Sequence, residues 1–289
     1  IRRAASREIY EKGRIGKGHR STIWQVARLA LASIMPQIRR SARYALATCY
    51  AVYCWVIYAL LAPVVWLSVS LLPGFSMRWS VMKMCSRLLA KATATPVRLN
   101  GLGNLPADES PCVLVSNHAS YLDAYVLVAM LPGHFRFTAK AELAARFIVR
   151  LPLQHIHTEF VERFDTSKSV RDTRHLSDVL KAGHTLVFFA EGTFTRTPGL
   201  MPFHLGAFSV AAQAGVPVIP VAIRGTRSIL RSGSWFPQRG SISVDIGPVI
   251  EPTELMQGTE EDTWRVAIDM RDRCRAYILR HCGEPDLAR

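Results

Sequence analysis

The feature that most constrains the fold of this chain is an uncharged stretch of 31 residues, 45–75. A helix needs about 20 apolar residues to cross a bilayer, so the stretch is longer than one span. Pro63 lies near its middle, and Pro73 and Gly74 close it. Basic residues flank both ends: Arg39, Arg40 and Arg43 before it, and Arg78, Lys83, Arg87 and Lys91 after it. Because a single span usually shows charge asymmetry, we predict a helical hairpin that bends near Pro63 and dips into one leaflet. A buried helix pair in a soluble domain is the alternative.

The distribution of charge favours a membrane over a nucleic acid as the partner of this chain. The formal net charge is +14, and residues 1–43 contain 11 Lys and Arg against two Glu. Positive charge beside apolar sequence is typical of the cytoplasmic side of a membrane. We therefore expect a bacterial protein at the cytoplasmic face of the inner membrane, with a solvated basic tail as the alternative. The sequence shows no recognisable RNA- or DNA-binding motif, so nucleic-acid binding is disfavoured.

From residue 95 onward, short apolar runs alternate with helical patterns. Several runs are apolar on both faces, which is typical of a central sheet covered by helices. The predicted fold class is therefore α/β, a central mostly parallel sheet flanked by helices and preceded by the membrane-associated helical hairpin. Strands are expected at residues 97–100, 112–115, 135–139, 156–161, 185–189, 217–223 and 242–246, and helices at 120–130, 142–150, 169–181, 204–214 and 260–281.

The first candidate site follows the run 112–115. His118 comes directly after the polar pair Ser116 and Asn117, and Asp123 follows five residues later. The two side chains diverge on one continuous helix or strand, so they meet only if a strand ends at His118 and a helix begins before Asp123. Ser120 with an acid three residues on predicts a capping box at that point. A carboxylate that orients a neutral imidazole makes a general base. Alternatively, Asp123 only caps the helix.

The second candidate site follows the run 185–189. Gly192 permits close approach of the backbone to a ligand, Thr193 offers a hydroxyl group, and Arg196 offers a phosphate-binding fork. Glu191 is expected to orient loop amides or a basic residue, or to bind substrate hydroxyls. Arg163 follows the run 156–161, at the edge of the sheet where ligands of α/β proteins gather. Each of these residues also has a purely structural interpretation.

Four blocks in this order resemble the glycerolipid acyltransferase family, which makes phosphatidic acid and remodels lysophospholipids. The blocks are Asn117-His118 through Asp123, Val161-Glu162-Arg163, Phe189-Ala-Glu191-Gly192-Thr193-Phe194, and the apolar run 216–221; the resemblance covers about residues 96–245. Ala190 stands where the family usually has proline, and Phe194 where an arginine often follows the threonine. Arg196 could supply that positive charge from two positions on.

The resemblance implies an O-acyltransferase in which His118 is the general base and Asp123 holds its ring. The acceptor would be a lysophospholipid or 1-acylglycerol-3-phosphate, and the donor an acyl thioester of acyl-carrier protein or coenzyme A, with no cofactor and no metal. The substrate-binding residues would be Asn117, Lys140, Arg163, Glu191, Gly192, Thr193 and Arg196. Two alternatives remain, namely acylation of a lyso-lipid without phosphate and a non-catalytic lipid-binding membrane anchor.

We divide the chain into residues 1–20, 21–94 and 95–289. Residues 1–13 resemble the C-terminus of adenylate-forming acyl ligases, so an upstream acyl-ligase domain is expected in the same parent chain. Residues 21–94 hold an amphipathic surface helix near 22–35 and the apolar hairpin. Residues 95–289 form the α/β acyltransferase domain. The six cysteines show no CxxC spacing and no accompanying His cluster, which favours a reduced protein.

Overall fold

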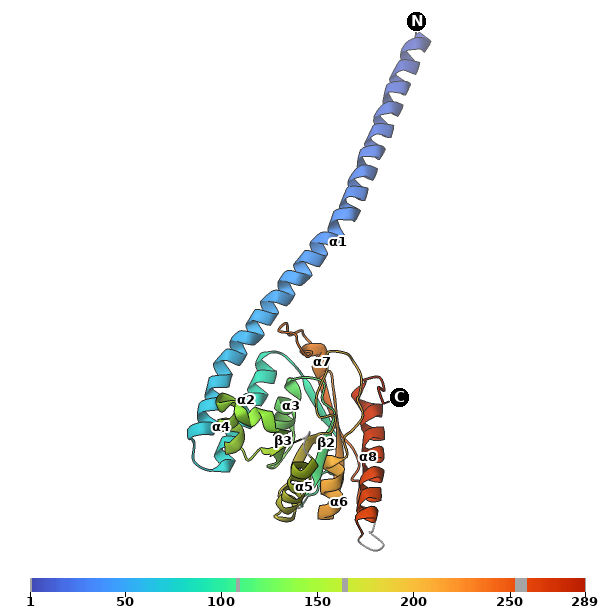
Figure 1. Cartoon of the computed structure of the whole chain (residues 1–289). Coiled ribbons are helices and arrows are strands. Elements are labelled where there is room, and N and C mark those ends of the chain that lie inside the picture. Colours follow the sequence, from blue (N-terminus) through green and yellow to red (C-terminus); the bar gives the residue numbers. More distant parts are fainter. Residues whose placement is uncertain (1, 108–109, 163–165, 253–258, 289) are drawn as a thin grey trace. The chain divides into compact units, whose positions relative to one another are not determined.

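A computed structural model describes the backbone of residues 2–107, 110–162, 166–252 and 259–288, and their side chains except those of 2–34 and 166–170 (Figure 1). The chain divides into two units, Ile1–Ala51 and Val52–Arg289. Helix α1 (Arg2–Leu71) belongs to both, and the second unit contains everything that follows. Among the described residues, one helical stretch, Met35–Leu71, is long and apolar enough to cross a membrane, by length and composition.

A helical hairpin is present in the second unit, but the prediction that it bends near Pro63 is wrong. Helix α1 continues through Pro63 to Leu71, and α2 (Phe75–Ala92) runs back beside it, with Tyr53 Oη donating a hydrogen bond to the carbonyl of Ala92 (2.9 Å). Proline in a helix interior costs about 3 kcal/mol, but its φ is helical, so the many other hydrogen bonds of a helix this long can carry it past Pro63. The turn falls at residues 72–74, where Gly74 takes a φ of 77° that other residues avoid.

Within the described residues, seven strands form one sheet in the order β1-β7-β6-β2-β5-β3-β4. Neighbouring strands are parallel except for the antiparallel pair β6–β7. This confirms the predicted α/β class and all seven expected strands, although the strand expected at 156–161 begins only at Glu159. The strands are β1 Val97–Asn100, β2 Val113–Ser116, β3 Arg136–Lys140, β4 Glu159–Val161, β5 Leu186–Phe189, β6 Val218–Arg224 and β7 Ile242–Ile246.

Helices cover both faces of the sheet. One apolar core joins it to α5, α6 and α8, and the other joins it to α2 and α3 (Figure 1). The helix expected at 142–150 is a 3₁₀ turn followed by α4, and the short helix α7 and one further 3₁₀ turn were not expected. The remaining bounds are η1 Leu102–Asn104, α3 Leu122–Met130, η2 Ala141–Ala145, α4 Phe147–His155, α5 Thr166–Lys181, α6 Gly206–Ala214, α7 Thr226–Ile229 and α8 Glu260–Cys282.

Candidate active site

The chain leaves the sheet at the carboxyl end of β2, where Asn117 fixes its direction. Asn117 Nδ2 donates to the carbonyl oxygen of Ile223 (2.9 Å), and the Ile223 N–H donates to Asn117 Oδ1 (2.8 Å). This side chain therefore extends the β2–β6 pairing, and it is 1% exposed. The substrate-binding role expected for Asn117 does not fit this geometry, because its amide is buried and already paired with β6.

His118 and Asp123 meet as their spacing predicts, because β2 has ended and α3 begins between them. His118 Nδ1 lies 2.8 Å from Asp123 Oδ2, and the same oxygen accepts the N–H groups of Ala119 (2.7 Å) and Ser120 (2.8 Å). Asp123 is completely buried. Three donors on one oxygen hold the carboxylate and, through it, the ring of His118. The other oxygen, Oδ1, has no hydrogen-bond partner among the described residues.

The capping box expected at Ser120 forms only in part. Asp123 accepts the N–H of Ser120, but α3 begins at Leu122, and its N-terminal boundary residue is Tyr121. The hydroxyl of Ser120 accepts the Leu122 N–H (3.2 Å) and donates to the carbonyl of Leu230 (2.5 Å). A tertiary partner thus takes the hydroxyl that the local motif would have used, and it ties the His118 loop to the segment after α7.

Aromatic rings surround the imidazole. The ring of His118 stacks on Phe189 (4.1 Å between centroids, 18° between planes), and Phe194 packs against it at 4.3 Å. Tyr121 meets Phe194 edge-on at 4.7 Å. The His118 side chain is 17% exposed, and its Nε2 has no hydrogen-bond partner among the described residues. Nε2 is therefore the atom that can accept a proton from an incoming hydroxyl group.

Glu191 connects the two motif loops through backbone amides. Its Oε1 accepts the N–H of His118 (2.7 Å), and its Oε2 accepts the N–H of Met201 (2.8 Å). The side chain is 4% exposed, and this burial raises the pKa of the Glu191 carboxyl to about 7. The two amide donors and the positive charge of Arg227 pull its pKa the other way. Glu191 thus orients loop amides, which was one of the roles expected for it.

This burial predicts a pH-dependent contribution to stability. The folded-state pKa of Glu191 lies above its ordinary value of 4.5. The stability that the neutral carboxyl contributes is therefore fully present below pH 4.5 and is lost as pH rises through about 7. Over that range we expect wild type to lose about 3 kcal/mol of unfolding free energy relative to Glu191→Gln, which does not ionise there. Denaturant unfolding of both proteins in detergent from pH 4.5 to 8 measures the difference. Curves that stay parallel would contradict it.

Three of the remaining sequence candidates, Gly192, Thr193 and Arg196, follow Glu191 on the same loop. Gly192 has a φ of 71°, and its N–H donates to the carbonyl of Phe189 (2.9 Å) in a tight turn. Thr193 and Arg196 are exposed on the loop that follows. Lys140 is half-buried at the carboxyl end of β3, which is parallel to its neighbour β5, so both strands end at the same edge of the sheet. Arg163 lies outside the described residues.

The sequence did not predict the hydrogen bonds by which Arg227 and Glu284 hold this loop. Arg227 donates to the carbonyls of Thr195 (2.6 Å) and Thr197 (3.1 Å) and to Glu284 Oε1 (2.7 Å). Glu284 in turn accepts the N–H of Gly199 (2.7 Å). Arg227 and Glu284 are 57 positions apart, and no local pattern links them. The aromatic residues Phe189 and Phe194 were visible beside Glu191, but nothing in their spacing indicated that both would contact His118.

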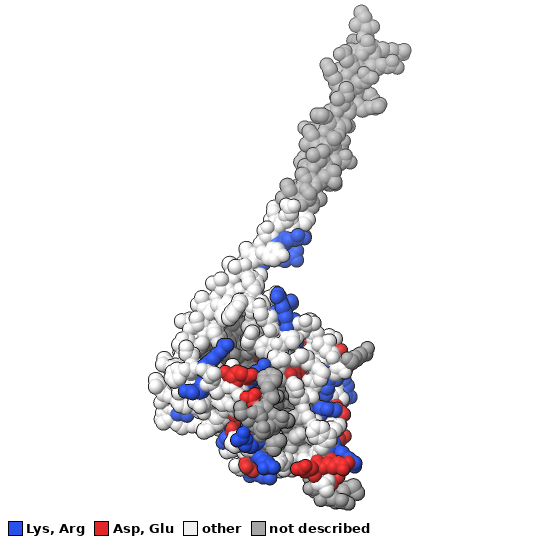
Figure 2. All heavy atoms as spheres, viewed as in Figure 1, with Lys and Arg blue, Asp and Glu red and all other residues white. Residues whose placement is uncertain are grey.

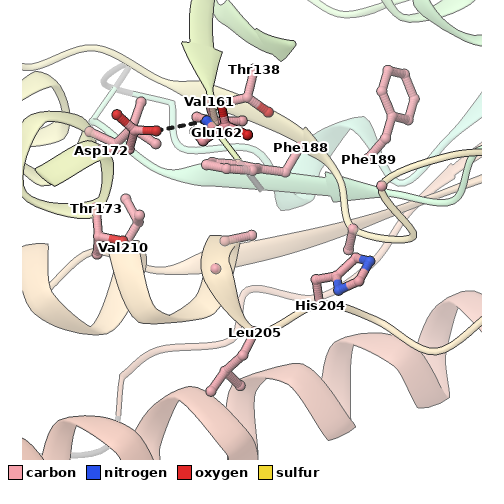
Figure 3. Close-up of a pocket in the computed structure, with 15 residues that line it drawn as sticks. Thr138, Val161, Glu162, Asp172, Thr173, Phe188, Phe189, His204, Leu205 and Val210 are labelled. Atoms are coloured by element: carbon pink, nitrogen blue, oxygen red, sulfur yellow. Dashed lines mark hydrogen bonds between the residues drawn. The ribbon is translucent and has the colours of Figure 1, made fainter. Parts of the chain in front are cut away.

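A cavity of about 300 Å³ adjoins the same loop (Figure 3). Phe189 and His204 line one part of it, and Glu162 and Asp172 another, where Asp172 accepts the N–H of Glu162 (2.8 Å); Gly192 also lines the cavity. His118 and Asp123 are not among its lining residues. The cavity therefore neighbours the candidate site and shares Phe189 with it, without containing the His118–Asp123 pair.

Comparisons with known proteins agree with the resemblance that the motifs carry. Residues 96–224 match the family model described as Acyltransferase. A chloroplastic 1-acyl-sn-glycerol-3-phosphate acyltransferase of Brassica napus is 35% identical over 136 residues, 47% of this chain and 39% of that protein. A lyso-ornithine lipid O-acyltransferase of Brucella abortus is 36% identical over 137 residues, 45% of this chain and 50% of that protein. The chain thus spans half or less of the length of these two relatives.

A solved structure shares the fold. The crystal structure of the 1-acyl-sn-glycerophosphate acyltransferase PlsC from Thermotoga maritima matches with a TM-score of 0.60 and 22% sequence identity. The match covers 82% of this chain and 97% of that chain. At this identity the likeness shows the architecture, and it supports the α/β class found here.

Proposed function

We propose that this chain, which matches the acyltransferase family over residues 96–224, is a membrane-associated O-acyltransferase. It would move a fatty acyl group from an acyl thioester to the free hydroxyl of a lysophospholipid such as 1-acylglycerol-3-phosphate. The observation that carries the proposal is the 2.8 Å contact between His118 Nδ1 and the buried Asp123, with Nε2 unpaired and accessible. The relative from Brassica napus, named for this reaction, supports it.

The proposed mechanism transfers one proton through His118, forms one C–O bond and breaks one C–S bond. His118 Nε2 takes the proton of the acceptor hydroxyl while Asp123 holds the ring and stabilises its positive charge. The acceptor oxygen attacks the thioester carbonyl and forms a C–O bond. The tetrahedral intermediate then collapses, the C–S bond breaks, and the thiolate that leaves takes the proton back from His118.

In this proposal basic residues bind the acceptor. Glu191 and Gly192 are used by the backbone of the loop itself, so in this proposal they shape the site rather than contact substrate. Lys140, Arg196 and Arg163 are the cations proposed for an acceptor phosphate, because guanidinium and ammonium groups bind phosphate oxygens well.

The proposed location is the cytoplasmic face of a bacterial inner membrane, with α1 as the anchor. In support, Met35–Leu71 is long and apolar enough to cross a bilayer, and the face of α1 beyond residue 51 leaves many large apolar side chains exposed. An acyl-ligase domain upstream in the parent chain remains a prediction from residues 1–13, as does the choice between acyl-carrier protein and coenzyme A as donor carrier.

Acylation of a lyso-lipid without phosphate is the second candidate, and a specific observation favours it. Phe194 rather than a cation packs on His118, and Arg196 is exposed without a hydrogen bond or ion pair among the described residues. The Brucella abortus relative is named for an ornithine lipid acceptor. The ring of Phe194 offers no positive charge beside His118, so this site suits an acceptor without a phosphate there.

Acyl transfer by the detergent-purified chain tests both candidates. Labelled acyl-carrier protein and acyl-coenzyme A would be offered with 1-acylglycerol-3-phosphate, other lysophospholipids and a lyso-ornithine lipid. Phe194→Arg would run beside wild type. We expect transfer to at least one lyso-lipid, and Phe194→Arg to shift preference towards phosphate-bearing acceptors, since it adds a phosphate-binding fork. Transfer to none of them from either donor would overturn the proposed function.

A further inference from the structure

Four aromatic side chains join α1, α3 and the loop of residues 231–239 into one aromatic cluster. The ring of Trp55 lies 5.4 Å from that of Trp235 and 5.6 Å from that of Tyr58, and its Nε1 donates to the Trp235 carbonyl (2.7 Å). Tyr58 meets Tyr125 edge-on, with 3.3 Å between their hydroxyl oxygens. All four residues lie within the unit Val52–Arg289. The cluster therefore fixes the loop of residues 231–239 against α1, which Tyr58 in turn joins to α3.

The tip of this loop is apolar and its flanks are basic. Trp235 is 79% exposed and Phe236 is 40% exposed, while Arg231 and Arg239 are exposed on either side. No acidic residue occurs anywhere in residues 224–244. Exposed tryptophan and phenylalanine side chains flanked by arginines are typical of segments that lie at the interface between water and lipid. The positive charge is complementary to an anionic lipid surface.

Helix α1, which the loop contacts through Trp55, also has an apolar surface. Six side chains of this helix recur at intervals of three or four residues and leave about half or more of their surface exposed, namely Val52, Val56, Leu60, Val64, Leu67 and Leu71. Figure 2 shows the surface over this part of α1 without charged side chains. Trp55, which holds Trp235, lies on the same helix segment. The loop and this part of α1 therefore each expose apolar side chains and are joined through Trp55, and a bilayer is the partner that such an area fits.

We propose that residues 231–239 form a second membrane contact, with Trp235 and Phe236 at the headgroup level of an anionic bilayer. The aromatic cluster then marks where the bilayer surface meets the protein. Tyr125 of this cluster lies two residues beyond Asp123, and Tyr121 contacts the Phe194 that packs on His118. The cluster thus holds the catalytic pair at headgroup depth, where the hydroxyl of a lyso-lipid lies; this last step rests on the proposed function.

Fluorescence quenching in bilayers tests the contact directly and requires no turnover. The full chain would be reconstituted into phosphatidylcholine–phosphatidylglycerol vesicles with or without a headgroup-spin-labelled lipid. The chain has six tryptophans, so each contribution is read from a replacement. Trp235→Phe is expected to lower the quenched share of the fluorescence. The matched control Trp264→Phe, which removes a 58% exposed ring on α8, is expected not to lower it.

Each outcome decides the matter. An unchanged or increased quenched share in Trp235→Phe overturns the proposal. Shielding of Trp235 by acyl-carrier protein in detergent, or quenching that disappears when the vesicles are diluted in lipid, overturns it in favour of a protein partner or a second copy. As a functional readout, Trp235→Ala with Phe236→Ala is expected to raise KM for acceptor in vesicles by about tenfold or more, because two exposed rings that the bilayer would cover are lost. Because quenching is independent of catalysis, it can succeed even if the proposed reaction fails.

Discussion

Replacing His118 with alanine is expected to lower acyl transfer by about 10²- to 10⁴-fold, the range that a positioned general base contributes. The Nε2 atom of the imidazole has no hydrogen-bond partner among the described residues, and the ring lies beside those of Phe189 and Phe194. Initial rates with saturating donor and varied acceptor give kcat/KM for wild type and variant. The loss should fall mainly in kcat, because the base acts in the transition state more than in binding.

Two controls separate loss of the base from loss of the fold. The alanine variant removes the imidazole from the buried Asp123 and leaves it with two backbone N–H donors. Thermal unfolding must therefore be measured as well. His118→Gln keeps an amide that can donate to Asp123 yet cannot act as a base, and we expect it to be as inactive as the alanine variant. His281→Ala, which removes an imidazole bonded to the backbone of its own helix α8, should retain activity. Activity of His118→Gln within a fewfold of wild type would refute His118 as the base.

Replacing Asp123 with alanine is expected to cost on the order of 10³-fold in kcat, because one oxygen of this carboxylate serves three donors. Its removal releases the imidazole ring and the N–H groups of Ala119 and Ser120 together. Asp123→Asn should be milder. Its amide oxygen can occupy the position of Oδ2 and keep all three contacts, so only the negative charge is lost, at a cost of about 10- to 100-fold.

The order of these two variants is the test of the geometry. Steady-state rates of Asp123→Asn and Asp123→Ala, with thermal unfolding of each, would be compared with those of the double variant His118→Ala, Asp123→Ala. Since the two residues act as a unit, the double variant should be little worse than His118→Ala alone. Equal rates for asparagine and alanine at position 123 would show that orientation by Oδ2 has no catalytic value. Fully additive losses would show that the two side chains act separately.

The α/β class, the seven strands and the meeting of His118 with Asp123 could be predicted from the sequence because each depends on short-range patterns. Apolar runs define buried strands, and a strand that ends before a helix begins brings residues five apart onto the same side. The position of the hairpin turn was harder to predict. Pro63 and the pair Pro73–Gly74 are both candidate breaks, and only the second lets the backbone adopt a positive φ.

Side-chain roles that depend on distant partners could not be predicted in this way. Asn117 belongs to a motif that suggests contact with substrate, yet its amide is paired with Ile223, 106 positions away. Orientation of loop amides was one role expected for Glu191, but local sequence does not reveal that its partners are the amides of His118 and Met201. The same is true of Arg227, whose carbonyl and carboxylate partners come together only when α7 and the C-terminal segment fold against the loop.

The sequence by itself thus determined the architecture, the meeting of His118 with Asp123 and the apolar segment beside basic charge, because local periodicity and spacing encode all three. Only the tertiary structure decided that aromatic rings enclose His118, that Glu191 joins two loops, and that Trp235 rests on α1. Contacts of this kind arise when strands and helices far apart in the chain pack together. Their geometry depends on the packing of the whole domain, which a local pattern does not specify.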